Sequence, residues 1–107
     1  MLVVIDIGNT NITMGIYKEN KLLGNYRLTT KMKRTSDEYG FMLMNFLQAS
    51  KVESDEIQDV IVSSVVPKIM HSFLNSIRKY MHKEPIVVGP GIKTGISVKA
   101  ENPKAVG

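Results

Sequence analysis

The stretch DIGNTN, Asp6 to Asn11, directly follows a short apolar run and contains residue types that bind phosphate. A phosphate-binding loop needs small residues, so that backbone N–H groups can approach the anion, together with side-chain donors and a carboxylate for an accompanying magnesium ion. Gly8 has no Cβ to block that approach, and Asp6, at the expected end of a strand, can hold Mg²⁺ directly or through water. The further side-chain donors are Asn9, Thr10, Asn11 and Thr13.

A purely structural interpretation explains the same residue types. In a tight hairpin, Gly8 would supply a positive φ angle, and Asn9 and Asn11 would cap the turn. The chain has no Walker A pattern ending in Gly-Lys-Ser/Thr, so a phosphate loop here must be of the hairpin type. The residue types alone leave both interpretations open.

Hydrophobic patterning predicts the strands on either side of this stretch. Four consecutive apolar residues, Leu2–Ile5, indicate a strand buried on both faces. Alternation over Ile12–Tyr17 predicts a half-buried strand, and Leu22–Thr29 follows after the polar turn Lys18–Lys21. We therefore expect a three-stranded antiparallel meander with DIGNTN at its first bend.

Helical and extended segments then alternate along the chain. Thr35 and Glu38 have the spacing of a capping box, and an amphipathic helix follows them. Asp59–Val66 is a second apolar strand, Pro67 suits the first turn of a second helix, and Ile86–Val88 is a last short strand. The order β-β-β-α-β-α-β fits an α/β fold of the ribonuclease-H-like kind, a mixed sheet flanked by helices, better than a doubly wound fold that alternates from its start.

Polar residues in these later elements have two interpretations each. Thr35, Asp37 and Glu38 could face an active cleft, but a capping box explains their types without a ligand. Ser63 and Ser64 interrupt a buried strand near its carboxyl end, where ligands collect in open α/β sheets. They could equally be small residues required for helix packing.

Composition bounds the class of protein. Of the 107 residues, 43% are hydrophobic and 22% are charged, which favours one globular domain over residues 1–107. The net charge of +4 would suit an anionic ligand, but the basic residues are scattered and form no dense nucleic-acid or membrane patch. The absence of cysteine excludes thiol catalysis and cysteine-ligated zinc. Since no apolar stretch approaches the ~20 residues that span a bilayer, we expect a cytoplasmic protein with neither nucleic acid nor membrane as partner.

Several segments together resemble the type III pantothenate kinases, a family within the superfamily of sugar kinases, heat-shock chaperones and actin. They occur in the family's order from one end of the chain to the other. The segments are DIGNTN at Asp6–Asn11, RTSDEYG at Arg34–Gly40, VSSVVP at Val62–Pro67, and GIKTGI with ENPKAVG within Gly91–Gly107. Each motif is weak by itself, and the ordered set is specific.

The resemblance implies transfer of the γ-phosphoryl group of ATP to pantothenate, giving 4'-phosphopantothenate in the first step of coenzyme A synthesis. It also implies Mg²⁺ with the ATP, a monovalent cation (K⁺ or NH₄⁺), and a homodimer. In the family the first turn holds the ATP phosphates, which corresponds here to Asp6, Gly8, Asn9, Thr10, Asn11 and Thr13.

Two positions depart from the family pattern. The catalytic aspartate belongs to a GADR-like motif, of which this chain has only the glycine, Gly107, so the expected general base lies beyond the last residue. A family tyrosine that touches pantothenate corresponds to Ala100, which puts substrate contact there in doubt. We therefore expect an N-terminal phosphate-binding domain that is truncated and inactive alone, because phosphoryl transfer needs a positioned base. Alternatives are a non-catalytic regulatory or binding protein on the same scaffold, or another small-molecule kinase of the superfamily.

Overall fold

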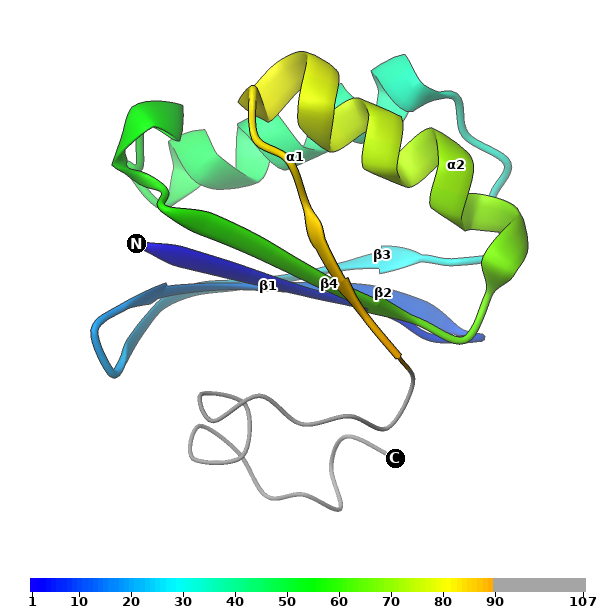
Figure 1. The fold of residues 1–107 in the computed structure, drawn as a ribbon, viewed down its shortest axis with the longest axis horizontal. Coiled ribbons are helices and arrows are strands. Elements are labelled where there is room, and N and C mark those ends of the chain that lie inside the picture. Colours follow the sequence, from blue (N-terminus) through cyan, green and yellow to red (C-terminus); the bar gives the residue numbers. More distant parts are fainter. Residues whose placement is uncertain (90–107) are drawn as a thin grey trace.

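A computed structural model of the chain describes residues 1–89. Its core is a five-stranded mixed sheet in the order β3-β2-β1-β4-β5, and Figure 1 shows both long helices on one face of this sheet. The predicted element order is confirmed. The strands are β1 (Leu2–Ile7), β2 (Asn11–Lys18), β3 (Lys21–Thr29), β4 (Asp59–Ser64) and β5 (Ile86–Val88).

The first three strands form the predicted antiparallel meander, and β4 adds to β1 in parallel. β1 is longer than expected because the alternation of buried residues continues through Ile7. Asp6 is therefore inside the strand and the bend begins at Gly8. The expectation that this strand is buried on both faces is wrong: Val3, Ile5 and Ile7 are buried under the helices, whereas the alternate residues are only partly buried.

Helix α1 (Ser36–Ala49) begins at the predicted capping box. The Glu38 N–H donates to Thr35 Oγ1 over 3.2 Å, and the Thr35 N–H donates to a Glu38 carboxylate oxygen over 2.7 Å. This arrangement satisfies two N–H groups that the first turn would leave unpaired. The capping interpretation of Thr35 and Glu38 is therefore confirmed.

Helix α2 (Pro67–Ser76) has its proline in the first turn, as predicted, and continues into the π-helical turn η2 (Ile77–Met81). A short 3-10 turn, η1 (Ser54–Glu56), precedes β4. The largest buried side chains from the helices are Tyr39, Leu43, Leu47, Phe73, Ile77 and Met81. They pack on the buried face of the sheet, so a single core fixes the ends of β1 and β4 relative to α2.

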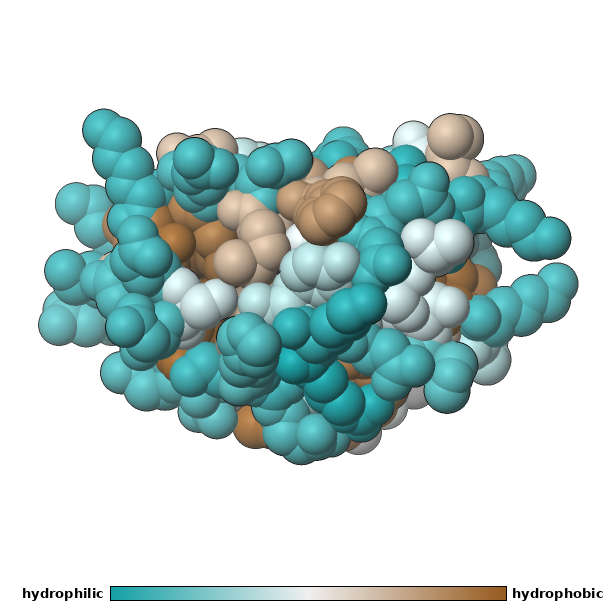
Figure 2. All heavy atoms as spheres, turned by 90° about the horizontal axis from the view of Figure 1, so that it is seen from above, coloured by the Kyte–Doolittle hydropathy of each residue, from teal (hydrophilic) through white to brown (hydrophobic). Residues whose placement is uncertain are grey.

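The helix-bearing side of the molecule is mostly hydrophilic, with apolar side chains exposed at a few places (Figure 2). Among the exposed apolar residues are Met32 and Phe41. None of the helices within residues 1–89 combines the length and the apolar character needed to cross a membrane.

Candidate functional site

The bend between β1 and β2 is open at its tip. The Gly8 N–H donates to the Asn11 carbonyl oxygen over 2.9 Å, which closes the base of the turn. Asn9 and Thr10 are exposed, and Asn9 makes no hydrogen bond to any residue in the range 1–89. The φ angle of Gly8 lies outside the left-handed region, so this glycine is not required for a positive φ. A Cβ at Gly8 would instead lie 3.2 Å from the Asn11 carbonyl oxygen, which is a tight contact.

Thr30, the residue after β3, fastens the bend from outside. Its N–H donates to the Thr10 carbonyl oxygen over 2.9 Å, and its Oγ1 donates to the Gly8 carbonyl oxygen over 2.8 Å. Thr30 is buried. The Gly8 and Thr10 carbonyl groups therefore accept hydrogen bonds from Thr30, while the side chain of Asn9 stays available to a ligand.

Polar side chains from three neighbouring strands form a row across the sheet, one residue pair before the last pair of β1 and β2. Asp6 pairs with Thr13 on β2 and with Ser63 on β4, so all three side chains lie on the face opposite the helices. Ser63 Oγ donates to Asp6 Oδ1 over 2.9 Å. This contact orients the carboxylate and leaves its other oxygen able to bind a cation. Since Ser63 lies on the face away from the helices, the helix-packing interpretation is wrong for Ser63.

Ser64 has a different role. Its Oγ accepts a hydrogen bond from the Val66 N–H over 2.9 Å, at the turn that leads from β4 into α2. The pair Ser63 and Ser64 thus shapes the carboxyl end of β4, with one hydroxyl on the aspartate and the other on the backbone.

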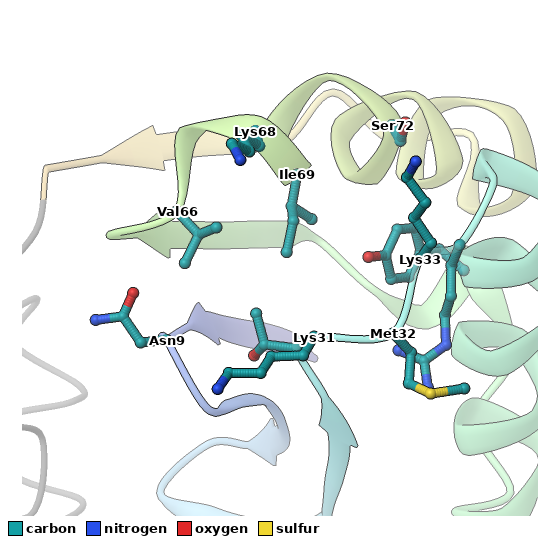
Figure 3. Close-up of a pocket in the computed structure, with 11 residues that line it drawn as sticks. Asn9, Lys31, Met32, Lys33, Val66, Lys68, Ile69 and Ser72 are labelled. Carbon is teal, nitrogen blue, oxygen red and sulfur yellow. The ribbon is translucent and has the colours of Figure 1, made fainter.

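A cavity of about 490 Å³ lies on the helix side of the bend (Figure 3). It is bounded by the β3–α1 loop, by the start of α2 and by Asn9. Of the residues in the range 1–89 that line it, four are cationic and none is acidic; the cationic residues are Lys31, Lys33, Arg34 and Lys68. The sequence prediction of scattered basic residues missed this cluster, although the run KMKR directly after a strand was a usable signal.

The cations of the cavity differ in how they are held. Arg34 donates to the Thr29 carbonyl oxygen over 2.6 Å and lies over the ring of Tyr39 at 6.0 Å from its centroid. Burial raises the pKa of the Tyr39 hydroxyl, and the Arg34 charge opposes that rise. The ammonium groups of Lys31, Lys33 and Lys68 form no ion pair within the described part of the chain.

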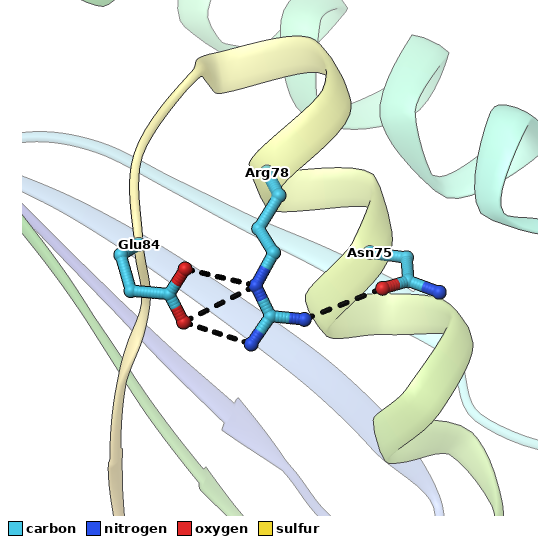
Figure 4. A network of polar contacts seen from close by, with 3 residues as sticks. All are labelled: Asn75, Arg78 and Glu84. Carbon is cyan, nitrogen blue, oxygen red and sulfur yellow. Dashed lines mark hydrogen bonds and ion pairs between the residues drawn. The ribbon is translucent and has the colours of Figure 1, made fainter.

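Other charged clusters serve the helices. Lys79 and Tyr80 donate to Asp37 over 2.9 and 2.7 Å, and the hydrogen bond from Lys79 is the main reason that the pKa of Asp37 lies below its ordinary value. Asp37 thus joins α1 to η2 and does not face the bend. Arg78 bridges Asn75 on α2 and Glu84 before β5, as Figure 4 shows.

No group of three or more acidic, histidine or cysteine side chains gathers within residues 1–89. Asp6 could hold Mg²⁺ without such a cluster, because this ion usually takes one or two carboxylates and completes its shell with water and substrate phosphate. The expected substrate positions Ala100 and Gly107, and the expected short strand at Gly95–Lys99, lie outside the described residues.

Solved structures of other proteins share this architecture. A ROK hexokinase from Thermus thermophilus aligns with a TM-score of 0.63 and 12% identity, over 84% of this chain and 34% of the hexokinase. A ROK family transcriptional regulator aligns with a TM-score of 0.61 and 12% identity, over 84% of this chain and 28% of the regulator. The chain has the ribonuclease-H-like fold of the actin-like ATPases, as predicted, with a polar bend at the end of its first strand.

The family follows from sequence comparison. A family profile described as type III pantothenate kinase matches residues 2–107. Relatives of that name from Bifidobacterium longum and Bifidobacterium animalis subsp. lactis are 52% and 47% identical over 107 residues. The chain belongs to the type III pantothenate kinase family, and it spans 42% of the length of these curated relatives.

Proposed function

We propose that the whole protein phosphorylates pantothenate to 4'-phosphopantothenate at the expense of ATP, and that this chain supplies the phosphate-binding bend. The main support is the geometry of the bend. Thr30 donates hydrogen bonds to two of its carbonyl groups, and Asn9 at its tip is exposed and makes no hydrogen bond within residues 1–89. Asp6 lies one register step behind the bend. Family membership supplies the substrate class.

In this proposal the bend holds the phosphates of ATP. Phosphoryl transfer depends on positioning and electrostatic stabilisation more than on covalent chemistry by the protein. Asn9, Thr10 and Asn11 present amide and hydroxyl donors, and Gly8 keeps the backbone close to the anion. Thr13 stands beside Asp6 on the same face and adds a hydroxyl there.

Asp6 is the proposed ligand of Mg²⁺. The ion, when bound with ATP, would neutralise charge on the phosphate oxygens. The Ser63 hydroxyl keeps the Asp6 carboxylate in one orientation. We propose K⁺ or NH₄⁺ as a further cofactor from the family relationship, and no residue in 1–89 is assigned to it.

The remaining parts of the proposal concern the whole protein. The general base is an aspartate that follows Gly107, and Gly107 itself lies at the pantothenate site, with Ala100 as the weaker candidate for contact. The protein acts as a cytoplasmic homodimer with ATP and pantothenate as its ligands. The 107-residue chain alone is catalytically inactive, because the base is absent from it.

The decisive experiment compares two carboxylates at two hairpins in the full-length enzyme. Asp6→Ala should lower kcat/KM for ATP-dependent pantothenate phosphorylation by at least about 100-fold, since several kcal/mol of charge stabilisation depend on the metal. Glu19→Ala, in the exposed turn between β2 and β3, is the matched control and should leave kcat/KM unchanged. Wild-type activity in Asp6→Ala would refute the proposed role of the bend. Nucleotide binding without any phosphorylation by the wild-type enzyme would instead support a non-catalytic protein.

A further inference from the structure

The cavity beside the bend combines unpaired positive charge with an apolar wall. Lys31, Lys33 and Arg34 from the β3–α1 loop and Lys68 from α2 line it, so its cationic residues come from two separate elements. All three lysines are exposed, so solvent screens their mutual repulsion, but their charges still favour an anion over a cation in the cavity. The arrangement therefore indicates an anionic ligand.

The other lining residues define what kind of anion fits. Val66 and Ile69 from the start of α2, Met32 from the loop and the ring of Tyr39 are apolar, and Figure 3 shows Val66 and Ile69 facing the loop across the cavity. A volume of about 490 Å³ is within the usual range for small-molecule sites, about 300–1,000 Å³. This lining is suited to a compact molecule that carries both a charged group and an apolar body.

The charge count favours a dianion over a monoanion. A phosphate monoester carries about two negative charges above its second pKa of about 6, and it offers three acceptor oxygens. Lysine is a common phosphate ligand because each ammonium group donates in several directions.

The cavity is separate from the proposed metal side of the bend. The Asp6, Thr13 and Ser63 side chains lie on the opposite face of the sheet from the helices, whereas the cavity lies on the helix side. Among the lining residues that the structure describes, Asn9 is the one that belongs to the bend. We propose that this cavity is a second anion site, which binds small phosphate monoesters with an apolar group and contacts the bend through Asn9. This inference goes beyond the proposed kinase function and does not depend on it.

The test uses phenyl phosphate as the probe and the full-length protein without ATP or Mg²⁺, at about pH 7.5 where the phosphate is dianionic. Binding is followed by calorimetry and by NMR of the Met32 and Ile69 methyl groups, which line the cavity. Benzoate has the same ring with one charge, and inorganic phosphate has the charge without the ring. Both should bind more weakly than phenyl phosphate.

The triple variant Lys31→Gln, Lys33→Gln and Lys68→Gln should weaken phenyl phosphate binding about tenfold or more, because each exposed ion pair contributes up to about fivefold. Lys21→Gln, an exposed lysine at the start of β3, is the matched control and should leave the affinity unchanged. Circular dichroism checks that both variants remain folded. Equal affinity in the triple variant, equal loss in Lys21→Gln, or binding that leaves the Met32 and Ile69 signals unmoved would each overturn the proposal. Because Mg²⁺ and ATP are absent, none of these results depends on whether the enzyme phosphorylates pantothenate.

Discussion

Two short polar hairpin turns occur in the same meander, and they differ in what surrounds them. The turn between β2 and β3 is closed by its own backbone: Lys18 pairs with Lys21, and Glu19 takes the left-handed conformation with a φ of 57°. The bend between β1 and β2 is also closed by a backbone hydrogen bond, from the Gly8 N–H to the Asn11 carbonyl oxygen, but it is in addition held from outside by Thr30. Both turns are polar, so their own composition does not distinguish them. The residues around the bend are what support it as the proposed site.

The cavities beside the two turns sharpen this difference. They have nearly equal volumes, about 490 Å³ at the bend and about 480 Å³ at the second turn. The second cavity is lined by Glu19 and Glu56 as well as Lys18, so its charges offset one another. The charged residues described along the first cavity are all cations. The volumes of the two cavities therefore do not distinguish them, whereas the charges of their lining residues do.

A large difference between the tips of the two turns should appear when the asparagine of each tip is truncated in the full-length enzyme. Asn9→Ala removes an unpaired amide from the proposed phosphate site, and hydrogen bonds to charged groups contribute about 1.5–3 kcal/mol. We expect kcat/KM for ATP to fall by about 10- to 100-fold. Asn20→Ala, at the exposed second turn, should leave kcat/KM within about twofold, since it loses no contact to a charged ligand. Equal effects of the two substitutions would show that the turns are functionally alike.

The sequence predicted the elements well because their signals are local. The capping box of Thr35 and Glu38, the first-turn proline of α2 and the alternation in β2 each depend on residues a few positions apart. The predicted burial of β1 on both faces failed because a continuous apolar run does not reveal which face the helices cover.

The candidate site was only partly predictable for a related reason. The chemistry of Asp6, Gly8 and Asn9 is readable from their types, but the roles of Thr30 and Ser63 depend on contacts across 22 and 57 residues. Lys68 joins the basic cavity only because α2 begins beside the β3–α1 loop. Contacts of this kind depend on the order of the strands in the sheet. The residue types at individual positions do not reveal that order.

A smaller effect, on the free energy of unfolding, should show whether the bend depends on Thr30 or is stable without it. Thr30→Val keeps the shape of the side chain but removes the hydroxyl that donates to the Gly8 carbonyl oxygen. Leaving that acceptor unpaired should lower the free energy of unfolding by about 1–3 kcal/mol. Thr29→Val, at the neighbouring exposed position, is the control and should change it by less than about 0.5 kcal/mol. Urea denaturation of each variant measures the difference, and a neutral Thr30→Val would mean that the bend holds itself.

The smallest effect, opposite in sign, is expected at the second turn. Glu19 adopts a left-handed conformation, which costs a residue with a side chain about 1–2 kcal/mol, whereas glycine adopts it freely but loses about 0.5–1 kcal/mol more in chain entropy. Glu19→Gly should therefore stabilise the chain by no more than about 1.5 kcal/mol. Asn20→Gly, whose φ is not positive, gains nothing from glycine and should destabilise it slightly. Because this turn is limited by its backbone alone, neither change should alter the affinity of the full-length enzyme for ATP, and an altered affinity would mean that the two turns are coupled through β2.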